Sequence, residues 1–387
     1  MTSGVKDQVE FRVLVNGEPL PASTNVWNSI KIVERAIDYG LPFAELSLRD
    51  SRAATHETHQ VAEGTRITIT AKRIDGDRER EMNFRVIGPI SSNRQGAGDH
   101  TNVWMCVLDH PRYYSQVHHF AARATSADMI GQVAAHCGLA YKCDQTTDSQ
   151  IWRNLSRKNM GFAKKICAHG YINEQSVMAM AVTAEDKTLH YRNLPVLFSQ
   201  KPVCRFILGN VQPKRDLPNY ICEQDRGCNT SGITNADFNY GYNSFIPQFS
   251  GTSNVKKVQA KKVGATHLYM SRNVKEDVGE ARVRYFPFID DEDVHKNYYK
   301  AVYQNARNLA LYSQFIAVLV PVQTVAQLFD LVELEESVNQ ADTRLTQRSG
   351  KYLVVAKGRL LAGSHYCEML LLVRNTIRQT TGRPAQI

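Results

Sequence analysis

Residues 64–75 read GTRITITAKRID, and apolar and polar side chains alternate from Ile67 to Lys72. Successive side chains of an extended chain point to opposite faces of a sheet, so Ile67, Ile69 and Ala71 would share one face. Threonine and lysine side chains would occupy the other face. The pattern predicts a half-buried strand that packs one apolar face against a core.

Further strands are predicted on both sides of this one, within the first 115 residues. The β-rich runs are VEFRVLVNG (9–17), AELSLRDS (44–51), EMNFRVIGPIS (81–91) and NVWMCVLDH (102–110). Asn16-Gly17 and Asp75-Gly76 are dipeptides typical of turns. Strands at such short intervals favour a small barrel or sandwich.

One helix is predicted to interrupt these strands, over residues 28–40 with the sequence NSIKIVERAIDYG. Ile30, Val33 and Ile37 recur at spacings of three and four, which places them on one helical face. Gly40 would end the helix, because glycine adopts the left-handed conformation common after a last helical turn.

The periodicity becomes helical from about residue 116 to 195. SADMIGQVAAHCG (126–138) predicts a helix with Ser126 as N-cap and Gly138 at its end. DSQIWRNLSRKN (148–159) predicts a second helix, and MGFAKKICAHG (160–170) continues to Gly170. Trp152, Leu155 and Phe162 are expected to be core anchors, and the intervening basic side chains to lie on a solvated or interface side.

From about residue 196 the chain is predicted to be extended again. The polar region 228–254 is either a long surface excursion or an extended strand pair. A strong helix is expected over 290–314, with acidic residues at its start, where the helix dipole favours negative charge. Strands are then predicted in QFIAVLVPV (314–322), LFDLVELEE (328–336), GKYLVVAKGRLLAG (350–363) and HYCEMLLLVRN (365–375).

The composition is that of an ordinary globular protein with a basic balance. The 387 residues are 43% hydrophobic and 22% charged, with a formal net charge of +9. Such a charge permits an acidic partner, nucleic acid included, although no five basic residues run together. No export signal or membrane anchor is expected. Without an export signal, we expect the eight cysteines to be reduced.

The histidines do not form a metal motif. His56 and His59 are three residues apart, whereas the zinc-protease motif needs histidines four apart on one helical face. His118 and His119 are adjacent, so their side chains point to different sides and cannot easily bind one ion. We expect a surface loop for the first pair, and packing or interface roles for the second.

Other reactive groups lack the arrangement that catalysis or cofactor binding requires. Cys167 and His169, two residues apart, would diverge by roughly 200° on a helix. GAGDH at Gly96 lacks the third glycine of a dinucleotide fingerprint. DDEDVH, from Asp290, could hold a hard cation, but helix capping explains it more simply. We therefore predict no catalytic, cofactor-binding or metal-binding residues, no cofactor, and a protein that is not an enzyme.

The order of these segments resembles a known family. VLDHPRYYSQVHHFAARATSADMIGQVAAHCGL (107–139), IWRNLSRKNMGFAKKICAHGYI (151–172) and SGKYLVVAKGRLLAGSHYCEMLLLVRN (349–375) are similar to motifs of baseplate or tail hub proteins of contractile-tailed phages. The relatives of that family include the hub-like N-terminal part of type VI secretion spike proteins. The resemblance spans nearly the whole chain, and its motifs are made of packing and turn residues.

The resemblance implies an α+β fold with two tail-tube-like β-barrel domains and helical and mixed insertions. The first barrel would comprise residues 1–115, and the second would comprise 196–235 with 315–387. The helical or mixed insertion would be 116–195, and a second insertion with a long helix would be 236–314. Tyr240 and Tyr242 are candidates for contacts between subunits, because tyrosine combines a large contact area with a polar tip.

The function implied is that of a structural hub. Three copies would form a homotrimeric ring of six barrels, which adapts a three-fold central spike to a six-fold tail tube and lets DNA pass during ejection. Its partners would be the spike, the tube and neighbouring baseplate proteins, in a virion tail assembled in the host cytoplasm. The basic side chains Arg153, Arg157, Lys158, Lys164 and Lys165 would mostly face solvent or a neighbouring tail protein.

A basic, sequence-independent nucleic-acid-binding protein is the alternative. Basic residues interleaved with aromatic ones are the signal for such binding, and WRNLSRKNMGFAKK (152–165) and RVRYFPF (282–288) are the best candidates.

Overall fold

The structure of the protein is a computed structural model. It describes residues 9–20, 27–36, 40–51, 60–73, 79–95, 99–173, 176–229, 245–249, 255–259, 295, 314–337, 348–362 and 365–374. Several predictions lie outside these residues: Ile37, Asp75-Gly76, His56 and His59, the glycines of GAGDH, Tyr240 and Tyr242, RVRYFPF, and the acidic run at Asp290. Of the helix predicted over 290–314, only His295 and Gln314 are described, and Gln314 is the first residue of a strand.

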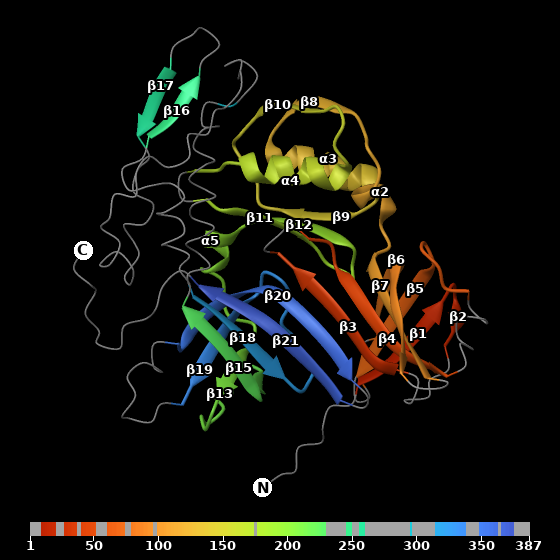
Figure 1. The fold of residues 1–387 in the computed structure, drawn as a ribbon. Helices are drawn as coiled ribbons and strands as arrows, with labels where there is room; N and C mark the ends of the chain where they lie inside the picture. The colour runs from red at the N-terminus through yellow and green to blue at the C-terminus, as the bar shows by residue number, and fades with distance from the viewer. Residues whose placement is uncertain are drawn as a thin grey trace.

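One sheet of fourteen strands is the frame of the molecule. Its N-terminal part has the order β3-β4-β7-β6-β5-β1-β2, in the orange and red half of Figure 1. The strands are β1 (Val9–Val15), β2 (Glu18–Pro19), β3 (Trp27–Arg35), β4 (Phe43–Ser51), β5 (Arg66–Arg73), β6 (Glu79–Gln95) and β7 (Asp99–Leu108).

The C-terminal part continues the same sheet through the pair β20–β3. Along this part β14-β13-β19-β20-β21-β18-β15 are neighbours. The strands are β13 (Arg205–Leu208), β14 (Asn219–Ile221), β15 (Gln224–Asn229), β18 (Gln314–Val320), β19 (Leu331–Glu336), β20 (Gly350–Ala362) and β21 (His365–Arg374). Strand β20 pairs with β19 through its first residues and with β3 through its last, with an irregularity between Val354 and Ala356.

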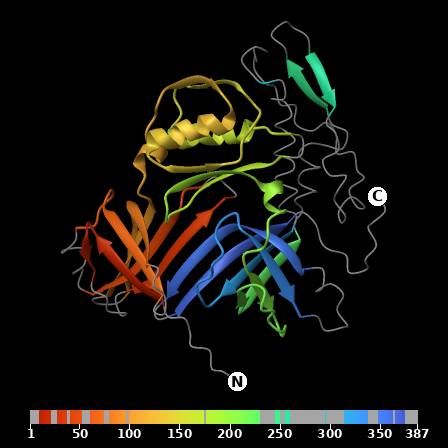
Figure 2. The same ribbon diagram turned by 180° about the vertical axis from the view of Figure 1, so that it is seen from behind.

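Residues 111–197 form a separate layer over the junction of the two parts (Figures 1 and 2). Two helices lie between the antiparallel pair β8–β10 and the three-stranded sheet β11-β12-β9. The elements are α2 (Pro111–Tyr114), β8 (Phe120–Ala124), α3 (Ser126–Cys137), β9 (Ala140–Cys143), β10 (Gln150–Asn154), α4 (Asn159–His169), β11 (Met178–Val182), β12 (Thr188–Asn193) and α5 (Leu194–Leu197).

Most of the strand predictions are confirmed. Ile67, Ile69 and Ala71 are buried on one face of β5. Asn16 and Gly17 form the predicted turn, with φ of 50° and 90°. The predicted C-terminal strands are β18, β19, β20 and β21. In the polar region, Phe245–Phe249 (β16) pairs antiparallel with Val255–Gln259 (β17), which favours the strand-pair alternative over a plain excursion.

The helix predicted over residues 28–40 is wrong, because Trp27–Arg35 is strand β3. The residues buried on its inward face are Ile30, Ile32 and Glu34, with a period of two. Val33, which the helical pattern required inside, is only half-buried on the opposite face. Ile30, Val33 and Ile37 fit a helical period, whereas Ile30 and Ile32 fit an extended one, and pairing with β4 and β20 decides for the strand.

The helix predicted over 148–159 is also wrong, since its middle is strand β10, paired with β8. Trp152 is buried there, and Phe162 is buried on α4, so these two anchors are confirmed. Leu155, the third, is 75% exposed. Helix α3 begins one residue from the predicted cap: Thr125, not Ser126, accepts a hydrogen bond from the Asp128 backbone N–H, while Gly138 ends the helix with φ of 77°.

The stretch from about 196, expected to be extended, begins inside the short helix α5 and reaches strand β13 only at Arg205. The α+β class holds, with strands in the majority. The pairing among the described strands is open and does not close into a barrel. No helix among the described residues is long and apolar enough to cross a membrane.

The buried side chains show why the layer is fixed to the sheet. One apolar cluster runs from the N-terminal strands, with Ile67 and Phe84, into the layer, with Ile130 and Phe162. A second cluster fills the C-terminal part of the sheet, and a third lies between β11, α5 and β20. The layer therefore shares its core with the sheet and is not an appendage on a linker.

Replacing Trp152 by alanine should lower the free energy of unfolding by about 3–5 kcal/mol, because the indole is 2% exposed and its truncation leaves a cavity. Its N–H also donates to the Ala124 carbonyl, at 3.1 Å. Denaturant unfolding followed by fluorescence and circular dichroism measures the change. Leu155→Ala, on the same segment but exposed, is the control and should change stability by less than about 0.5 kcal/mol. Equal effects of the two substitutions would contradict the assignment.

Candidate functional site

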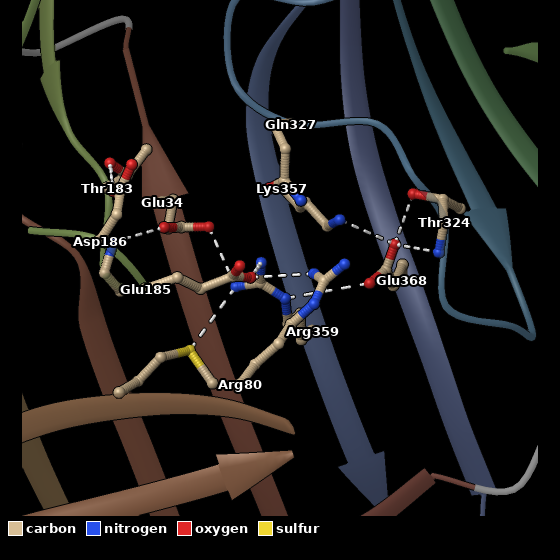
Figure 3. A network of polar contacts seen from close by, with 12 residues as sticks. Glu34, Arg80, Thr183, Glu185, Asp186, Thr324, Gln327, Lys357, Arg359 and Glu368 are labelled. Atoms are coloured by element: carbon tan, nitrogen blue, oxygen red, sulfur yellow. Dashed lines mark hydrogen bonds and ion pairs between the residues drawn. The ribbon is translucent and has the colours of Figure 1, made fainter. Parts of the chain in front are cut away.

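A cluster of buried charges lies where the two parts of the sheet and the layer meet (Figure 3). Lysine and arginine side chains project from β20, and carboxylates come from β3, from β21 and from the turn between β11 and β12. Three cations and three anions take part: Lys357, Arg359, Arg80, Glu34, Glu185 and Glu368.

Arg359 is the centre of the cluster and is 1% exposed. Its guanidinium donates to Glu34 of β3 at 3.0 Å and to Glu185 of the β11–β12 turn at 2.6 Å. Glu185 also accepts from Arg80 of β6, at 2.9 Å. The other oxygen of Glu34 accepts from the Ala184 backbone N–H, at 2.7 Å. The turn of the layer is thereby bonded to both parts of the sheet.

Glu368 of β21 forms the second half of the cluster and has no exposed surface. One of its oxygens accepts from Lys357 at 3.1 Å, and from the backbone N–H and hydroxyl of Thr324. The other accepts from the Tyr366 hydroxyl at 2.7 Å. Lys357 donates in addition to the Ala326 carbonyl, at 2.8 Å. These bonds attach the segment between β18 and β19 to the sheet.

Burial and pairing act in opposite directions on these charges. Burial would raise the pKa of Glu368, but Lys357 and Arg359 outweigh it and hold that pKa below its usual value. Burial lowers the pKa of Lys357, and Glu368 offsets only part of that effect. For Arg359, burial is outweighed by Glu34, Glu185 and Glu368, so its pKa is raised.

Chemically, this cluster is suited to holding segments together. Its carboxylates accept from cations, hydroxyls or backbone N–H groups of the chain itself, and its members come from β3, β6, β20, β21 and two loops. A charge removed from water in this way is stable only while its partners stay in place. The cluster therefore makes the N-terminal strands, the layer and the C-terminal strands depend on one another for their stability.

The histidines and the cysteine that the sequence offered for chemistry, so far as the structure describes them, lie elsewhere and are not brought together into a site. His118 is exposed and stacks on His136 at 3.8 Å between ring centroids, and His119 is exposed beside it. Cys167 is buried, with its thiol 3.7 Å from the Met178 carbonyl oxygen, and His169 contacts the Lys165 carbonyl at 2.8 Å. Among the described residues, no group of histidine, cysteine or acidic side chains could hold a metal ion.

Sequence reasoning missed the ion cluster. The available signal was the occurrence of single charges on inward positions of apolar strands, as in VVAKGRLLA (354–362) and YCEMLLLV (366–373). Such charges are rarely buried unless paired. The pattern indicates that partners are needed but does not tell which ones.

The open sheet with a helical layer over its junction is similar in fold to solved structures of phage tail proteins. No family model matches the chain, and no curated protein is similar to it in sequence. Solved structures are similar to it over nearly the whole chain. The predicted resemblance to tail hub and type VI secretion proteins is therefore confirmed at the level of the fold.

A 43 kDa tail protein of prophage MuSo2 from Shewanella oneidensis has a TM-score of 0.60 and 10% identity, with 95% of this chain and 98% of that chain covered. A tail protein from Neisseria meningitidis has a TM-score of 0.57 and 9% identity, with 95% and 97% covered. An Escherichia coli component of the type VI secretion system, described as structurally similar to the T4 bacteriophage tail proteins gp27 and gp5, has a TM-score of 0.50 and 7% identity, with 96% and 80% covered.

Replacing Arg359 by methionine should lower the free energy of unfolding by about 3–5 kcal/mol, because Glu34 and Glu185 then lose their shared cation inside the protein. Arg12→Met is the matched control, since the Arg12–Glu10 pair is exposed and should contribute less than about 1 kcal/mol. Urea unfolding of both variants measures the difference. An Arg359 variant as stable as the control would show that the cluster does not hold the segments together.

Acid should weaken the fold through Glu368. Because its pKa is lower in the folded protein than in the unfolded chain, the carboxylate stabilises the fold at neutral pH. That contribution should be lost as pH falls below the ordinary glutamate value of about 4.3 and through the lower folded value. Urea midpoints measured from pH 6 to pH 3 test this. Glu368→Gln should be less stable at pH 6 but show a shallower decline, and parallel curves would contradict the assignment.

Proposed function

We propose that the chain is a structural subunit of a tail or baseplate hub that assembles as a homotrimeric ring. The observation that carries this proposal is the fold match over at least 95% of the chain to two phage tail proteins of nearly the same length. The similarity to a type VI secretion component related in structure to gp27 and gp5 gives further support for a hub.

In the proposed ring each subunit contributes two tube-like domains, residues 1–115 and residues 196–235 with 315–387, although their described strands form one open sheet and no closed barrel. Three copies then present six similar units, which adapts a three-fold spike to a six-fold tube. Residues 116–195 and 236–314 are the insertions. The division of the sheet into two seven-stranded parts joined at β3–β20 supports this arrangement.

The proposed role is mechanical and non-enzymatic, within the tail of a virion with a contractile tail. The spike, the tube and neighbouring baseplate proteins are the partners, and DNA passes through the lumen during ejection. Assembly takes place in the host cytoplasm. A heterologous contact repeated around a three-fold axis closes such a ring without leaving free faces.

Sequence-independent nucleic-acid binding is the second candidate, and the net charge of +9 favours it. It predicts an affinity for DNA that falls steeply with salt, because bound cations are released from the phosphates.

The mass of the purified chain decides the first candidate. Static light scattering over a concentration series should show an increase from 43.7 kDa toward three times that mass. A plateau at the dimer or tetramer mass, or a monomer at every concentration, would contradict a self-assembling trimer. Adding duplex DNA at two ionic strengths in the same series shows whether nucleic acid binds instead.

A further inference from the structure

The part of the layer up to Ile172 carries more than half of the net charge of the protein. Residues 110–172 contain eight lysines and arginines and three aspartates, a net charge of +5 out of +9. In the sequence these basic residues form no run, but the fold gathers several of them at one end of the layer.

The three aspartates of this segment do not neutralise the basic residues at that end of the layer. Asp148 is buried and accepts from the backbone N–H groups of Ser126 and Tyr171. Asp144 is paired with Arg192. Asp128 lies in the first turn, at the opposite end of α3, and accepts a hydrogen bond from the hydroxyl of the N-cap Thr125. Asp109, just before the segment, is paired with Arg85 and Arg66. The end of the layer therefore keeps its positive charge.

Hydrogen bonds bring the loop before β8 and the loop after β10 side by side. The side-chain amide of Asn154 donates to the carbonyls of His118 and Arg157, at 2.8 and 2.9 Å. Its oxygen accepts from the Arg157 backbone N–H, at 2.9 Å. Val117 forms a β-bridge with Lys158. Asn154 is buried, so both loops are fixed from beneath.

Aromatic contacts fix the same end from the side of α3. His118 stacks on His136 at 3.8 Å and meets the edge of Phe120 at 4.5 Å. Phe120 in turn stacks on the buried ring of Phe162, at 5.9 Å. We call the resulting area the loop-end surface; its residues are Arg112, Val117, His118, His136, Leu155, Arg157 and Lys158.

Two apolar side chains stand among the charges of the loop-end surface. Leu155 is 75% exposed and Val117 is 45% exposed, while Arg112, Arg157 and Lys158 are exposed around them. A single exposed leucine is ordinary, but here it is presented by a loop held by a buried asparagine and a β-bridge. Such preorganisation lowers the entropic cost of binding.

We propose that the loop-end surface docks onto an acidic surface of another protein subunit, with Leu155 entering an apolar hollow and Arg157 and Lys158 meeting carboxylates. Charge complementarity selects an acidic partner. The exposed leucine and valine select protein over nucleic acid, since a phosphate backbone offers them no apolar counterpart. The surface extends the proposed assembly role but does not depend on the trimer, so the light-scattering result and this one can fail separately.

The full-length chain is titrated, by fluorescence anisotropy, into a labelled peptide in which glutamate pairs alternate with leucines, and separately into a labelled DNA duplex. The peptide should bind to the wild type. Arg157→Glu together with Lys158→Glu should weaken peptide binding tenfold or more, and Leu155→Ser about tenfold, because burial of a leucine is lost. Lys142→Glu is the control, because Lys142 is exposed on β9, in another sheet of the layer. This substitution should change the affinity for the peptide less than twofold.

All these positions are exposed, so the thermal midpoint of each variant should match the wild type, which separates docking from folding. The proposal is overturned if the peptide does not bind, or if the loop-end variants and Lys142→Glu weaken it equally. The proposal is also overturned if DNA binds more tightly than the peptide and if that DNA binding is weakened by Arg157→Glu with Lys158→Glu but not by Leu155→Ser. The surface would then be a nucleic-acid site.

Discussion

The buried positive charge of Arg359 is the constraint on which the rest of the structure depends. A guanidinium removed from water requires carboxylates in contact with it, and this chain supplies them from two distant places, Glu34 on β3 and Glu185 in the β11–β12 turn. The N-terminal strands, the layer and the C-terminal strands must therefore be in place together. Lys357 and Glu368 extend the same requirement to the segment that follows β18.

Apolar burial alone would not impose this dependence. The clusters of buried side chains are contiguous, but apolar contacts are non-directional and tolerate small displacements of one segment on another. Ion pairs at 2.6–3.1 Å do not tolerate them, because each carboxylate would lose its donors. The cores supply most of the favourable free energy, and the charges select one relative placement of the segments.

The sequence predicted strands correctly where the spacing of apolar residues fitted only an extended chain and not a helix. Residues 67–72 alternate between apolar and polar side chains, and they lie within strand β5, Arg66–Arg73. Residues 28–40 contain one set of apolar residues with a helical spacing and another with an extended spacing, and only pairing with β4 and β20 distinguishes the two structures. Trp152 and Phe162 could be recognised as core anchors because large aromatic side chains are costly to expose. The strand that carries Trp152 could not be recognised, and a helix was predicted there instead.

The ion cluster lay beyond sequence reasoning for a different reason. Arg359 and Glu34 are 325 positions apart, and no local period connects them. Their inward orientation could be inferred from the strands, but their partners could not. The same holds for the loop-end surface, whose residues are gathered by Asn154 and by the contact of His118 with His136.

Strand β20 has a mechanical consequence. Its first residues are hydrogen-bonded to β19 and its last to β3, while β21 runs along almost its whole length. The two parts of the sheet thus meet through backbone bonds of a single strand, without a linker about which they could swing. A force pulling along β20 would strain many of these hydrogen bonds at once, in shear, so stress applied at one end of the subunit would travel to the other through a continuous stiff element.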